Sequence, residues 1–510
     1  MPDGLRAPMP NGAPRPDARP GGRRSWWLRE ALAAETPALR DAATPPFAGR
    51  ARADIAILGG GYTGLWAALR LTELAPGARI VLLERDVCGG GASGRNGGFV
   101  TGWWDELPAL VERHGPAEGL RLARAVGDTV GEVGAWAAAN GVDAWYRREG
   151  FVAVSAAPAQ DDAWREAVAL CERLGVGDEY VAMTADEVRG RVVSPVFRAG
   201  VFMRDGATVQ PARLARGLRW AALEHGVVIH EGTSVLPVGD SDRAGLAGGE
   251  GGGVAIRTSS AAGDGSLAAD QVIVALNAWA AAWPAFGRRL VTWSSYIVLT
   301  EPIPDRLAEI GWTGGEGVVD ARFTLHYART TPDGRIALGG GGGRAGFGGR
   351  IGRAFTHDAG SAERAAAGLR RWFPSLAGVR IEDAWGGPID ITADHLPFVA
   401  TSRGGRVHAG LGFSGNGVGP SLVVGRALAA LAAASALGTR AADDPWGSLP
   451  IVGATPRAFP PEPLRYLGAR VVREAIVRRE LAEEAGRRPG RVVAALSRLP
   501  RRLGYHLGPE

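Results

Sequence analysis

The first regular part of the chain alternates short apolar runs with an amphipathic one. Residues 54–58 (DIAIL) form an apolar run that stops at glycines, and residues 79–84 (RIVLLE) contain a second. Between them, TGLWAALRLTELA repeats its apolar positions with the period of a helix. Buried parallel strands are apolar along their whole length because helices cover both faces. The pattern therefore predicts a strand–helix–strand unit with a right-handed crossover, at the start of a doubly wound α/β domain.

A later region has the pattern of alternating strands. Apolar and polar residues alternate over 293–299 and within 324–338, which is typical of antiparallel strands. Before it, a helix is expected over 211–225, and a strand over 227–230 that returns to the first sheet. A buried strand and turn are expected over 271–279. The pattern predicts an antiparallel sheet inserted into the doubly wound domain.

The two ends of the chain differ in composition from its centre. Residues 1–50 are rich in Pro, Gly and Arg, which predicts a disordered arm with a short helix over 26–34. Residues 451–510 carry 12 arginines against 6 acidic residues and predict a basic helical extension. Its segment 471–485 spaces apolar residues as in a helix lying on a surface. We expect this helix to dock on the protein's own body, a partner or an anionic membrane surface, and not to contribute to the flavin site.

The composition excludes several classes of protein. All 58 basic residues are arginine, because the chain contains no lysine. P-loop nucleotide hydrolysis, pyridoxal-phosphate catalysis and Schiff-base chemistry each need a lysine amine and are therefore excluded. The excess positive charge belongs to the two ends, and the region between them is net acidic. We therefore expect no nucleic-acid partner.

Cysteines and apolar runs indicate the compartment. Cys88 and Cys171 are the only cysteines, which excludes a disulfide framework and a zinc site of several thiolates. We predict a reducing, cytoplasmic compartment and no bound metal. The most apolar stretch, 427–437, is shorter than the roughly 18 residues of a membrane span, so no transmembrane segment is expected. Arg23 and Arg24 resemble the start of a twin-arginine export signal, but charged residues interrupt the apolar run that such a signal needs.

A glycine motif follows the first predicted strand. Gly59, Gly61 and Gly64 have the spacing GxGxxG. The first glycine permits a tight turn, the second lets backbone N–H groups approach a pyrophosphate, and the third lets the helix pack closely on the strand. Glu84 lies 20 residues beyond Gly64, where a carboxylate can accept hydrogen bonds from a ribose. The motif and its context predict a dinucleotide site. Its neighbouring members are Tyr62, Thr63 and Arg85.

A second glycine-rich passage, RDVCGGGASGRNGGFVTGWW, follows Glu84. Here the chain resembles the FAD-dependent D-amino-acid oxidase (DAO) superfamily, in the branch that includes gamma-glutamylputrescine oxidase and aminophosphonate oxidoreductases. The resemblance covers about residues 53–437 in family order. The segments that carry it are 53–65, 91–98, 205–218, the strand ending in Asn277, 327–340 and 412–426.

The resemblance implies two domains built from separate segments of the chain. The first is a Rossmann-like FAD-binding domain, and the second is an α+β substrate domain with an antiparallel sheet. The FAD-binding domain would comprise residues 51–145, 200–290 and 385–440, and the substrate domain residues 146–199 and 291–384.

The resemblance also implies which residues contact FAD. A loop of glycines with one cation would lie against the pyrophosphate and the flavin, and Val235 would meet the adenine end. A helix beginning after Gly417 would stabilise negative charge on the reduced flavin. The implied residues are Ser93, Arg95, Asn96, Gly97, Gly98, Val235, Asn277, Gly412, Ser414, Gly415, Asn416, Gly417 and Val418.

The chain departs from the family pattern in its substrate and oxygen residues. Amino-acid oxidases of the superfamily place an arginine in a GLRP-like passage to bind the substrate carboxylate, whereas the matching passage here, 385–397, has Ile389. Sarcosine oxidases use a lysine beside the flavin to promote reaction with oxygen, and this chain has none. They attach flavin to a cysteine, but no cysteine follows Cys171. We therefore expect non-covalent FAD, and longer amines or amines with a distal anion, rather than glycine or D-alanine, as substrates.

The activity that the resemblance implies is oxidation of the CH–NH bond of an amine or amino-acid-like small molecule to an imine. Oxygen would accept the electrons, giving hydrogen peroxide. Two alternatives stay open at this stage. One is a flavin dehydrogenase that passes electrons to a protein or a quinone, and the other is a flavin-binding partner protein without amine turnover.

Candidates for the substrate side lie on a predicted strand and after the flavin loop. We assign His326, Tyr327 and Trp104 as catalytic candidates, with Trp103 beside Trp104 as a second wall residue. Arginines around the glycine run 339–343 are suited to binding a carboxylate or phosphonate through paired hydrogen bonds, although a solvated strand edge is the alternative for each. These arginines are Arg322, Arg329, Arg344 and Arg350; His395 beside Asp394 is expected to be structural.

Overall fold

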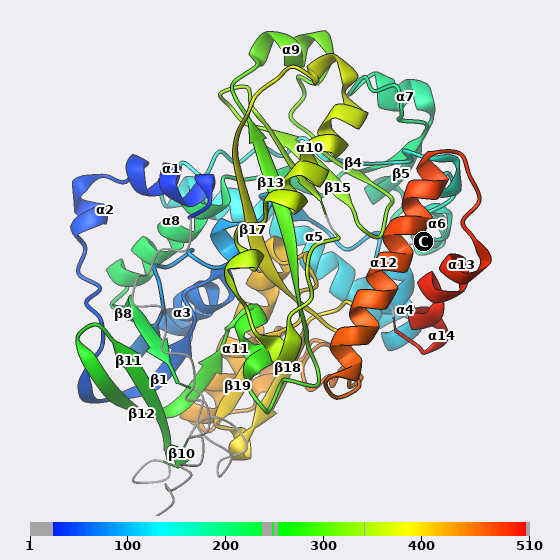
Figure 1. The fold of residues 1–510 in the computed structure, drawn as a ribbon. Helices are drawn as coiled ribbons and strands as arrows, with labels where there is room; N and C mark the ends of the chain where they lie inside the picture. The colour runs from blue at the N-terminus through cyan, green and yellow to red at the C-terminus, as the bar shows by residue number, and fades with distance from the viewer. Residues whose placement is uncertain (1–23, 237–246, 249–252, 341, 506–510) are drawn as a thin grey trace, which may run out of the picture.

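The structure is a computed structural model that describes residues 24–236, 247–248, 253–340 and 342–505. Two large sheets organise these residues, with helices packed on their outer faces (Figure 1). A short two-stranded sheet of β3 (Phe99–Thr101) and β7 (Gly206–Thr208) lies apart from both in the pairing.

The nine-stranded sheet contains the predicted doubly wound core. β2, β1, β12 and β8 run parallel, with Ile55 opposite both Ile80 and Gln271, and β19 extends the parallel part beside β12. Every residue of β2 is buried, as the continuous apolar pattern predicts. Antiparallel strands complete the sheet at its edges. The strands are β1 (Gly49–Leu58), β2 (Ile80–Leu83), β8 (Val228–His230), β9 (Thr233–Val235), β10 (Ala247–Gly248), β11 (Val254–Ser260), β12 (Gly263–Val274), β18 (Phe398–Ser402) and β19 (Val407–Leu411).

Helices α3 (Tyr62–Leu74) and α11 (Val418–Leu437) pack on this sheet, and further helices pack around them. These helices share one hydrophobic core with the parallel strands, and α11 is buried nearly all round. The further helices are α4 (Leu107–His114), α5 (Pro116–Ala139), α6 (Arg165–Arg173) and α8 (Pro211–Glu224). The most apolar stretch, expected to be the short run 427–437, belongs to a longer apolar helix that begins at Val418, so the expectation about its length is wrong. Among the described residues, α11 is the one helix long and apolar enough to cross a membrane, but 72% of that stretch is buried inside the fold.

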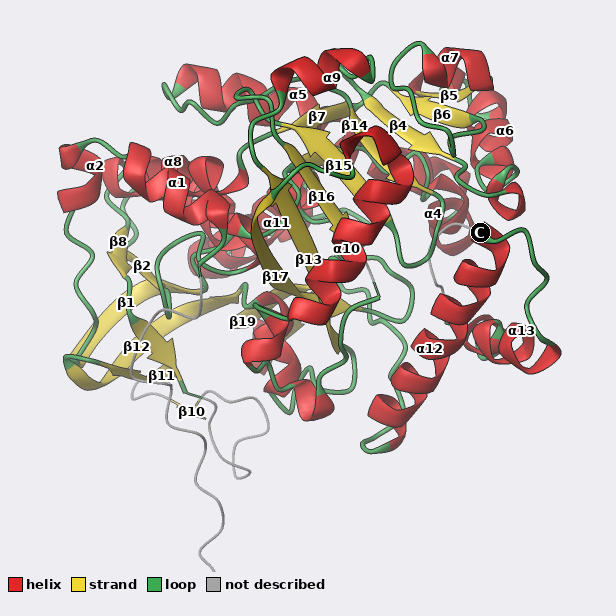
Figure 2. Cartoon of the chain, turned by 45° about the horizontal axis from the view of Figure 1, so that its top comes forward, coloured by secondary structure: helices red, strands yellow, loops and turns green. Residues whose placement is uncertain are grey.

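The eight-stranded sheet forms the second layer, and α10 (Ala359–Trp372) packs on one of its faces (Figure 2). An antiparallel sheet is expected from the sequence, but this sheet is mixed, because β14 pairs parallel with β4. It also includes β6 and most of β17, which the predicted boundaries at 200 and 385 assign to the cofactor domain. In order, its strands are β17 (Ile381–Ile391), β13 (Val291–Thr300), β16 (Ile336–Gly340), β15 (His326–Thr330), β14 (Gly317–Asp320), β4 (Phe151–Val154), β6 (Gly200–Met203) and β5 (Tyr180–Met183). The short helices near it are α7 (Ala185–Arg189) and α9 (Pro304–Glu309).

The predicted N-terminal arm is ordered from residue 24 onward, so the expected disorder is wrong for 24–50, whereas the short helix expected over 26–34 is confirmed; residues 1–23 lie outside the described residues. Helix α1 (Trp26–Ala34) buries Trp27 completely against Trp385 and is followed by α2 (Pro37–Asp41). Ser25 caps α1 and its hydroxyl donates to the carbonyl of Gly94. The arm therefore packs behind the second glycine-rich loop.

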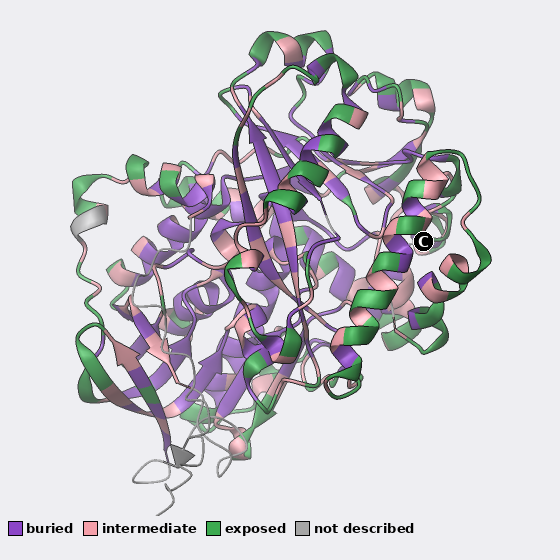
Figure 3. Ribbon diagram, viewed as in Figure 1, coloured by how far each residue is buried: buried purple, intermediate pink, exposed green. Residues whose placement is uncertain are grey.

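The C-terminal helices α12 (Leu464–Glu484), α13 (Arg491–Ser497) and α14 (Leu499–Arg502) pack on the protein's own body. Figure 3 shows α12 with an exposed side and a buried side. Of the three docking surfaces expected for this extension, the helices therefore occupy the protein's own body.

Candidate active site

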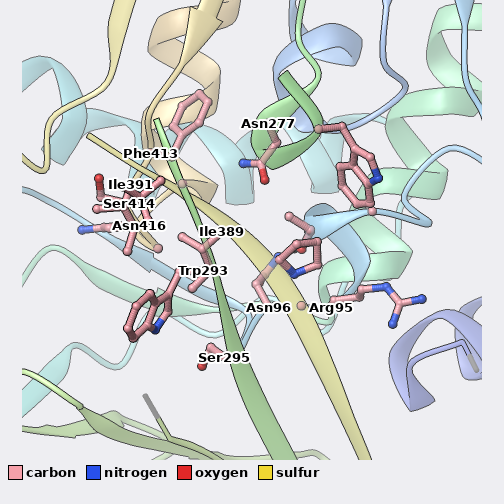
Figure 4. A pocket seen from close by; sticks show the side chains of 18 of the residues that line it. Arg95, Asn96, Asn277, Trp293, Ser295, Ile389, Ile391, Phe413, Ser414 and Asn416 are labelled. Atoms are coloured by element: carbon pink, nitrogen blue, oxygen red, sulfur yellow. The ribbon is translucent and has the colours of Figure 1, made fainter. Parts of the chain in front are cut away.

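One continuous cavity of about 2340 Å³ lies between the two sheets. The turns that follow β1, β2 and β12 line it from the nine-stranded sheet, as is usual at the carboxyl ends of parallel strands. From β13 come the alternate residues Trp293 and Ser295, because successive side chains of a strand point to opposite faces. Figure 4 shows these two side chains across the cavity from Asn277 and Phe413.

The first glycine loop is built for close approach. Gly59 has φ +108°, and a Cβ there would lie 2.4 Å from the carbonyl oxygen of Ala275. A Cβ at Gly64 would lie 2.1 Å from the carbonyl oxygen of Gly59, so helix and strand pack closely. At Gly61, by contrast, a Cβ would meet only the Ser93 hydroxyl, at 3.0 Å. The amino end of α3 therefore faces the cavity past Gly61, where Tyr62 and Thr63 also line it, which suits a pyrophosphate.

Glu84 stands at the end of β2, as predicted. Its carboxylate accepts hydrogen bonds from the backbone N–H groups of Gly60 and Asp86, both at 2.8 Å, and lines the cavity. Burial raises its pKa. Arg85 lies over the ring of Trp279 at 4.9 Å, and Val235 lines the same end of the cavity. The structure thus brings the predicted ribose and adenine residues together.

The second glycine loop is held by its own side chains. The Asn96 amide donates to the carbonyls of Ala92 and Ser93 at 3.0 Å, and its oxygen accepts from the N–H of Gly98 at 2.7 Å. The Ser93 hydroxyl accepts from the N–H of Tyr62 at 2.9 Å, which ties the two glycine loops to each other. Gly97 lines the cavity within this loop.

Arg95 lines the cavity and also holds that loop in place. Its Nε donates to the carbonyl of Gly90 at 3.0 Å and its Nη1 to that of Gly386 at 3.2 Å. Burial lowers its pKa to about 10. In Figure 4 its guanidinium points away from Ile389 and Trp293. These carbonyl contacts make Arg95 a residue that shapes the loop.

A buried carboxyl that sequence reasoning missed joins three parts of the site. Asp390 is fully buried; it accepts from the Asn277 amide at 2.9 Å and from the N–H groups of Gly412 and Phe413 at 2.5 and 3.2 Å. Burial raises its pKa to about 7, against the effect of these N–H donors. The one available signal was an acid inside an apolar strand, between Ile389 and Ile391. Asp390 therefore sets the position of the loop before α11.

The side chain of Asn277 indicates whether the site fits a ligand. This residue has φ +48°, lines the cavity, and its amide oxygen is buried without a hydrogen-bond partner. A buried acceptor of this kind costs free energy unless a donor meets it. The site therefore fits a ligand that presents an N–H or O–H group at this point, as a flavin dinucleotide does.

The loop from Gly412 to Val418 leads into α11. Gly412, Ser414 and Gly415 all have positive φ, and Ser414 to Val418 line the cavity. No side chain caps the amino end of α11. The helix thus presents backbone donors and the positive end of its dipole to the cavity, where they stabilise negative charge.

Of the two candidates on β15, only Tyr327 reaches the cavity. Its hydroxyl lies 2.9 Å from the Ser295 hydroxyl, and burial raises its pKa to about 12. His326 points to the opposite face, where its Nδ1 lies 3.1 Å from Asp320 and its ring packs on Trp372. The structure therefore does not support His326 as a catalytic residue.

Trp104 is likewise not at the cavity. It is 2% exposed, and its indole N–H donates to Asp205 at 3.1 Å. Trp103 is also buried in the core. The carboxyls that follow them, Asp105 and Glu106, do line the cavity and were missed. Burial and the neighbouring Glu106 raise the pKa of Asp105 to about 7.

The four candidate arginines divide into different environments. Arg350 lines the cavity. Arg322 also lines it but is paired with Glu480, and Arg344 is paired with Asp358 at 2.5 Å. Arg329 is fully buried, and its Nε donates to the carbonyl of Thr330 at 3.1 Å.

The structure also gives the positions of the other residues that the sequence singled out near the site. Ile389, the residue expected at the family's arginine position, lines the cavity within 3.8 Å of the position of a Cβ on Gly415. His395 also lines the cavity, while Asp394 pairs with Arg113. Cys88 is free and buried, outside the cavity lining. No cluster of three metal-ligating side chains occurs in the described part of the chain.

Comparisons with known proteins agree with this geometry. The DAO family, described as FAD dependent oxidoreductase, matches residues 54–431. The chain is 31% identical over 422 residues to a probable oxidoreductase OrdL of Rhizobium meliloti, covering 80% of this chain and 88% of the relative. It is 29% identical over 390 residues to gamma-glutamylputrescine oxidoreductase of Escherichia coli, covering 74% and 83%.

Solved structures share the fold. Glycine oxidase from Geobacillus kaustophilus superimposes with a TM-score of 0.59 at 20% identity, covering 76% of this chain and 95% of that one. L-proline dehydrogenase from P. horikoshii gives 0.57 at 18% identity, covering 80% of this chain and 96% of that one.

Proposed function

Because the chain belongs to the DAO family of FAD-dependent oxidoreductases, and FAD is the cofactor of that family, we propose that this enzyme oxidises an amine at its CH–NH bond. The amine loses a hydride from carbon and a proton from nitrogen, and water hydrolyses the resulting imine to a carbonyl compound and ammonia. Bound FAD supplies the two-electron oxidation. The gamma-glutamylputrescine oxidoreductase relative supports an amine substrate.

The observation that carries the proposal is Ile389 in the cavity wall. An isoleucine cannot bind a carboxylate, and it stands beside Gly415 where the family's amino-acid oxidases place an arginine. The wall here favours the uncharged carbon chain of an amine over the carboxylate of an amino acid. Asp105 and Glu106 line another part of the cavity, and the deprotonated form of this carboxyl pair attracts the cationic form of an amine; because the pKa of Asp105 is raised to about 7, this attraction strengthens as the pH rises through neutral.

The chain's own residues orient the reactants. Asp390 holds Asn277 and the N–H groups of Gly412 and Phe413 in place, so that the amino end of α11 meets the negative charge that develops on reduction. The Tyr327 and Ser295 hydroxyls can accept and donate hydrogen bonds to the amine. With its raised pKa, Tyr327 stays protonated at neutral pH and positions the amine without acting as a base.

The test is anaerobic mixing of the FAD-loaded protein with single compounds while flavin absorbance is followed. Hexylamine and 1,6-diaminohexane should bleach the flavin, whereas glycine and D-alanine should bleach it poorly. Efficient reduction by D-alanine, or no reduction by any amine, would overturn the proposal.

We propose non-covalent FAD and oxygen as the electron acceptor. Both cysteines are free and outside the cavity lining, which supports a flavin without a thioether link and an enzyme of the reducing cytoplasm. The absence of lysine favours one second candidate, a dehydrogenase that uses a quinone or a protein. Acid precipitation should release FAD into the supernatant. Substrate-dependent oxygen uptake with peroxide release would exclude the dehydrogenase.

A further inference from the structure

The helix α12 forms part of the cavity wall although it lies beyond the segment that matches the family, 54–431. Figure 1 places α12 on the side of the eight-stranded sheet, far from β1 and α3, and Figure 2 likewise separates α12 from β1. It is thus at the substrate end of the cavity. Its lining residues are Leu464, Arg465, Gly468, Ala469, Val472, Arg473 and Ile476.

Buried polar contacts fasten α12 to the substrate sheet. Glu480 is 6% exposed and accepts from the backbone N–H of Thr324 at 3.1 Å and from Arg322 Nη2 at 3.3 Å. Arg322 Nη1 lies 2.9 Å from Glu484. Near its amino end, Arg465 Nη1 donates to the carbonyl of Leu290 at 3.1 Å. Breaking a buried pair leaves an uncompensated charge, so these contacts hold the helix in one position.

The face that α12 turns to the cavity is mainly apolar. Ala469, Val472 and Ile476 recur at helical spacing, and Phe323 and Leu325 line the cavity from the loop that α12 packs against. The charged groups of this wall already have partners within the protein. Arg322 pairs with Glu480, Arg465 with Glu462 at 2.7 Å, and Arg473 Nε donates to the carbonyl of Gly342 at 2.6 Å.

We propose that α12 is the wall that contacts the non-reacting part of the substrate, and that this part is an aliphatic or aromatic chain. The proposal rests on amine oxidation as the proposed function. Because α12 comes from outside the family match, it sets a chain-length preference that the rest of the cavity does not determine. The contacts are with Val472 and Ile476, on one side of the helix.

Adjacent residues provide a matched pair of variants. Val472 lines the cavity, whereas Val471 is 50% exposed on the outer side of the helix. Val472→Trp should raise KM for hexylamine by about fourfold for each methylene that loses its contact, and leave KM for propylamine within about twofold. Val471→Trp should change neither value. Both variants should keep the FAD content and flavin spectrum of the wild type.

A labelling experiment tests the wall independently of turnover. Both native thiols are buried, so N-ethylmaleimide should modify the Val472→Cys protein at the new thiol. Hexylamine should slow this modification more than propylamine does, and neither should protect the Val471→Cys protein. If no amine reduces the wild-type flavin, the proposed function fails while this experiment still tests the wall. Equal protection by the two amines, or equal KM changes for both in Val472→Trp, would overturn the assignment of α12.

Discussion

The cofactor end and the substrate end of the cavity are built from different parts of the polypeptide. At the cofactor end, backbone groups form most of the cavity wall, which consists of two glycine loops and the amino ends of α3 and α11. At the substrate end, side chains from β13, β15, β17 and α12 meet, and these segments are far apart in sequence. A backbone-built region depends on local conformation, whereas a side-chain-built region depends on how distant elements pack.

The largest effect, a loss of bound FAD, should come from adding a side chain where the cofactor would approach the backbone. Gly61→Val places a side chain between the amino end of α3 and the ligand, so the purified protein should contain almost no FAD. It should still fold, because the added Cβ meets only the Ser93 hydroxyl. Flavin absorbance after purification measures the loss. Gly77→Val is the control, since nothing lies within 4 Å of a Cβ there. Full FAD content in Gly61→Val would contradict the backbone-built cofactor end.

At the substrate end, removing a buried carboxylate should cost stability without an equal loss of FAD. Glu480→Ala leaves Arg322 with one fewer buried partner, and should lower the free energy of unfolding by roughly 3–5 kcal/mol. Urea denaturation measures it. Glu474→Ala removes an exposed pair with Arg478 and should cost at most about 1 kcal/mol. Equal effects of the two variants would show that α12 is not fastened through Glu480.

At the cofactor end, the side chain of Asn277 should contribute to FAD binding. Asn277→Ala removes the buried, unpartnered amide oxygen that lines the cavity, and should weaken FAD binding by about tenfold. Titration of the apoprotein with FAD, followed by flavin fluorescence, gives the dissociation constant. Asn140→Ala, at an exposed helix end, should bind FAD as the wild type does. An unchanged dissociation constant in Asn277→Ala would remove this contact from the site.

The smallest effect should come from Tyr327. Tyr327→Phe loses the hydrogen bond with Ser295 and should lower kcat/KM by roughly three- to tenfold. Burial raises the pKa of Tyr327 to about 12, so its phenol loses its proton only above the assay range. The pH profile of kcat/KM from pH 6 to pH 10 should therefore keep its shape in the variant. Loss of the basic limb of that profile would show that Tyr327 titrates during catalysis.

Several features of the site could be predicted from sequence because they are local. The turn at Gly59, the packing at Gly64 and the place of Glu84 at the end of β2 follow from a strand–turn–helix of known spacing. The strand alternation of β13 also follows from local pattern, and Trp293 and Ser295 share the face that it implies. The helix expected at the C-terminus exists, and α12 lines the cavity at its substrate end, which no local pattern in the sequence indicated.

By itself, then, the sequence determined the elements, the glycine turns and the dinucleotide site, because backbone conformation and the period of apolar residues act over a few neighbouring residues. Only the tertiary structure decided which face of β15 meets the cavity, so that Tyr327 lines it and His326 does not. It also brought Asp390 to Asn277 and Glu480 to Arg322. These pairs are 113 and 158 residues apart in the chain. Such contacts arise from the packing of whole sheets and helices, and no local pattern encodes them.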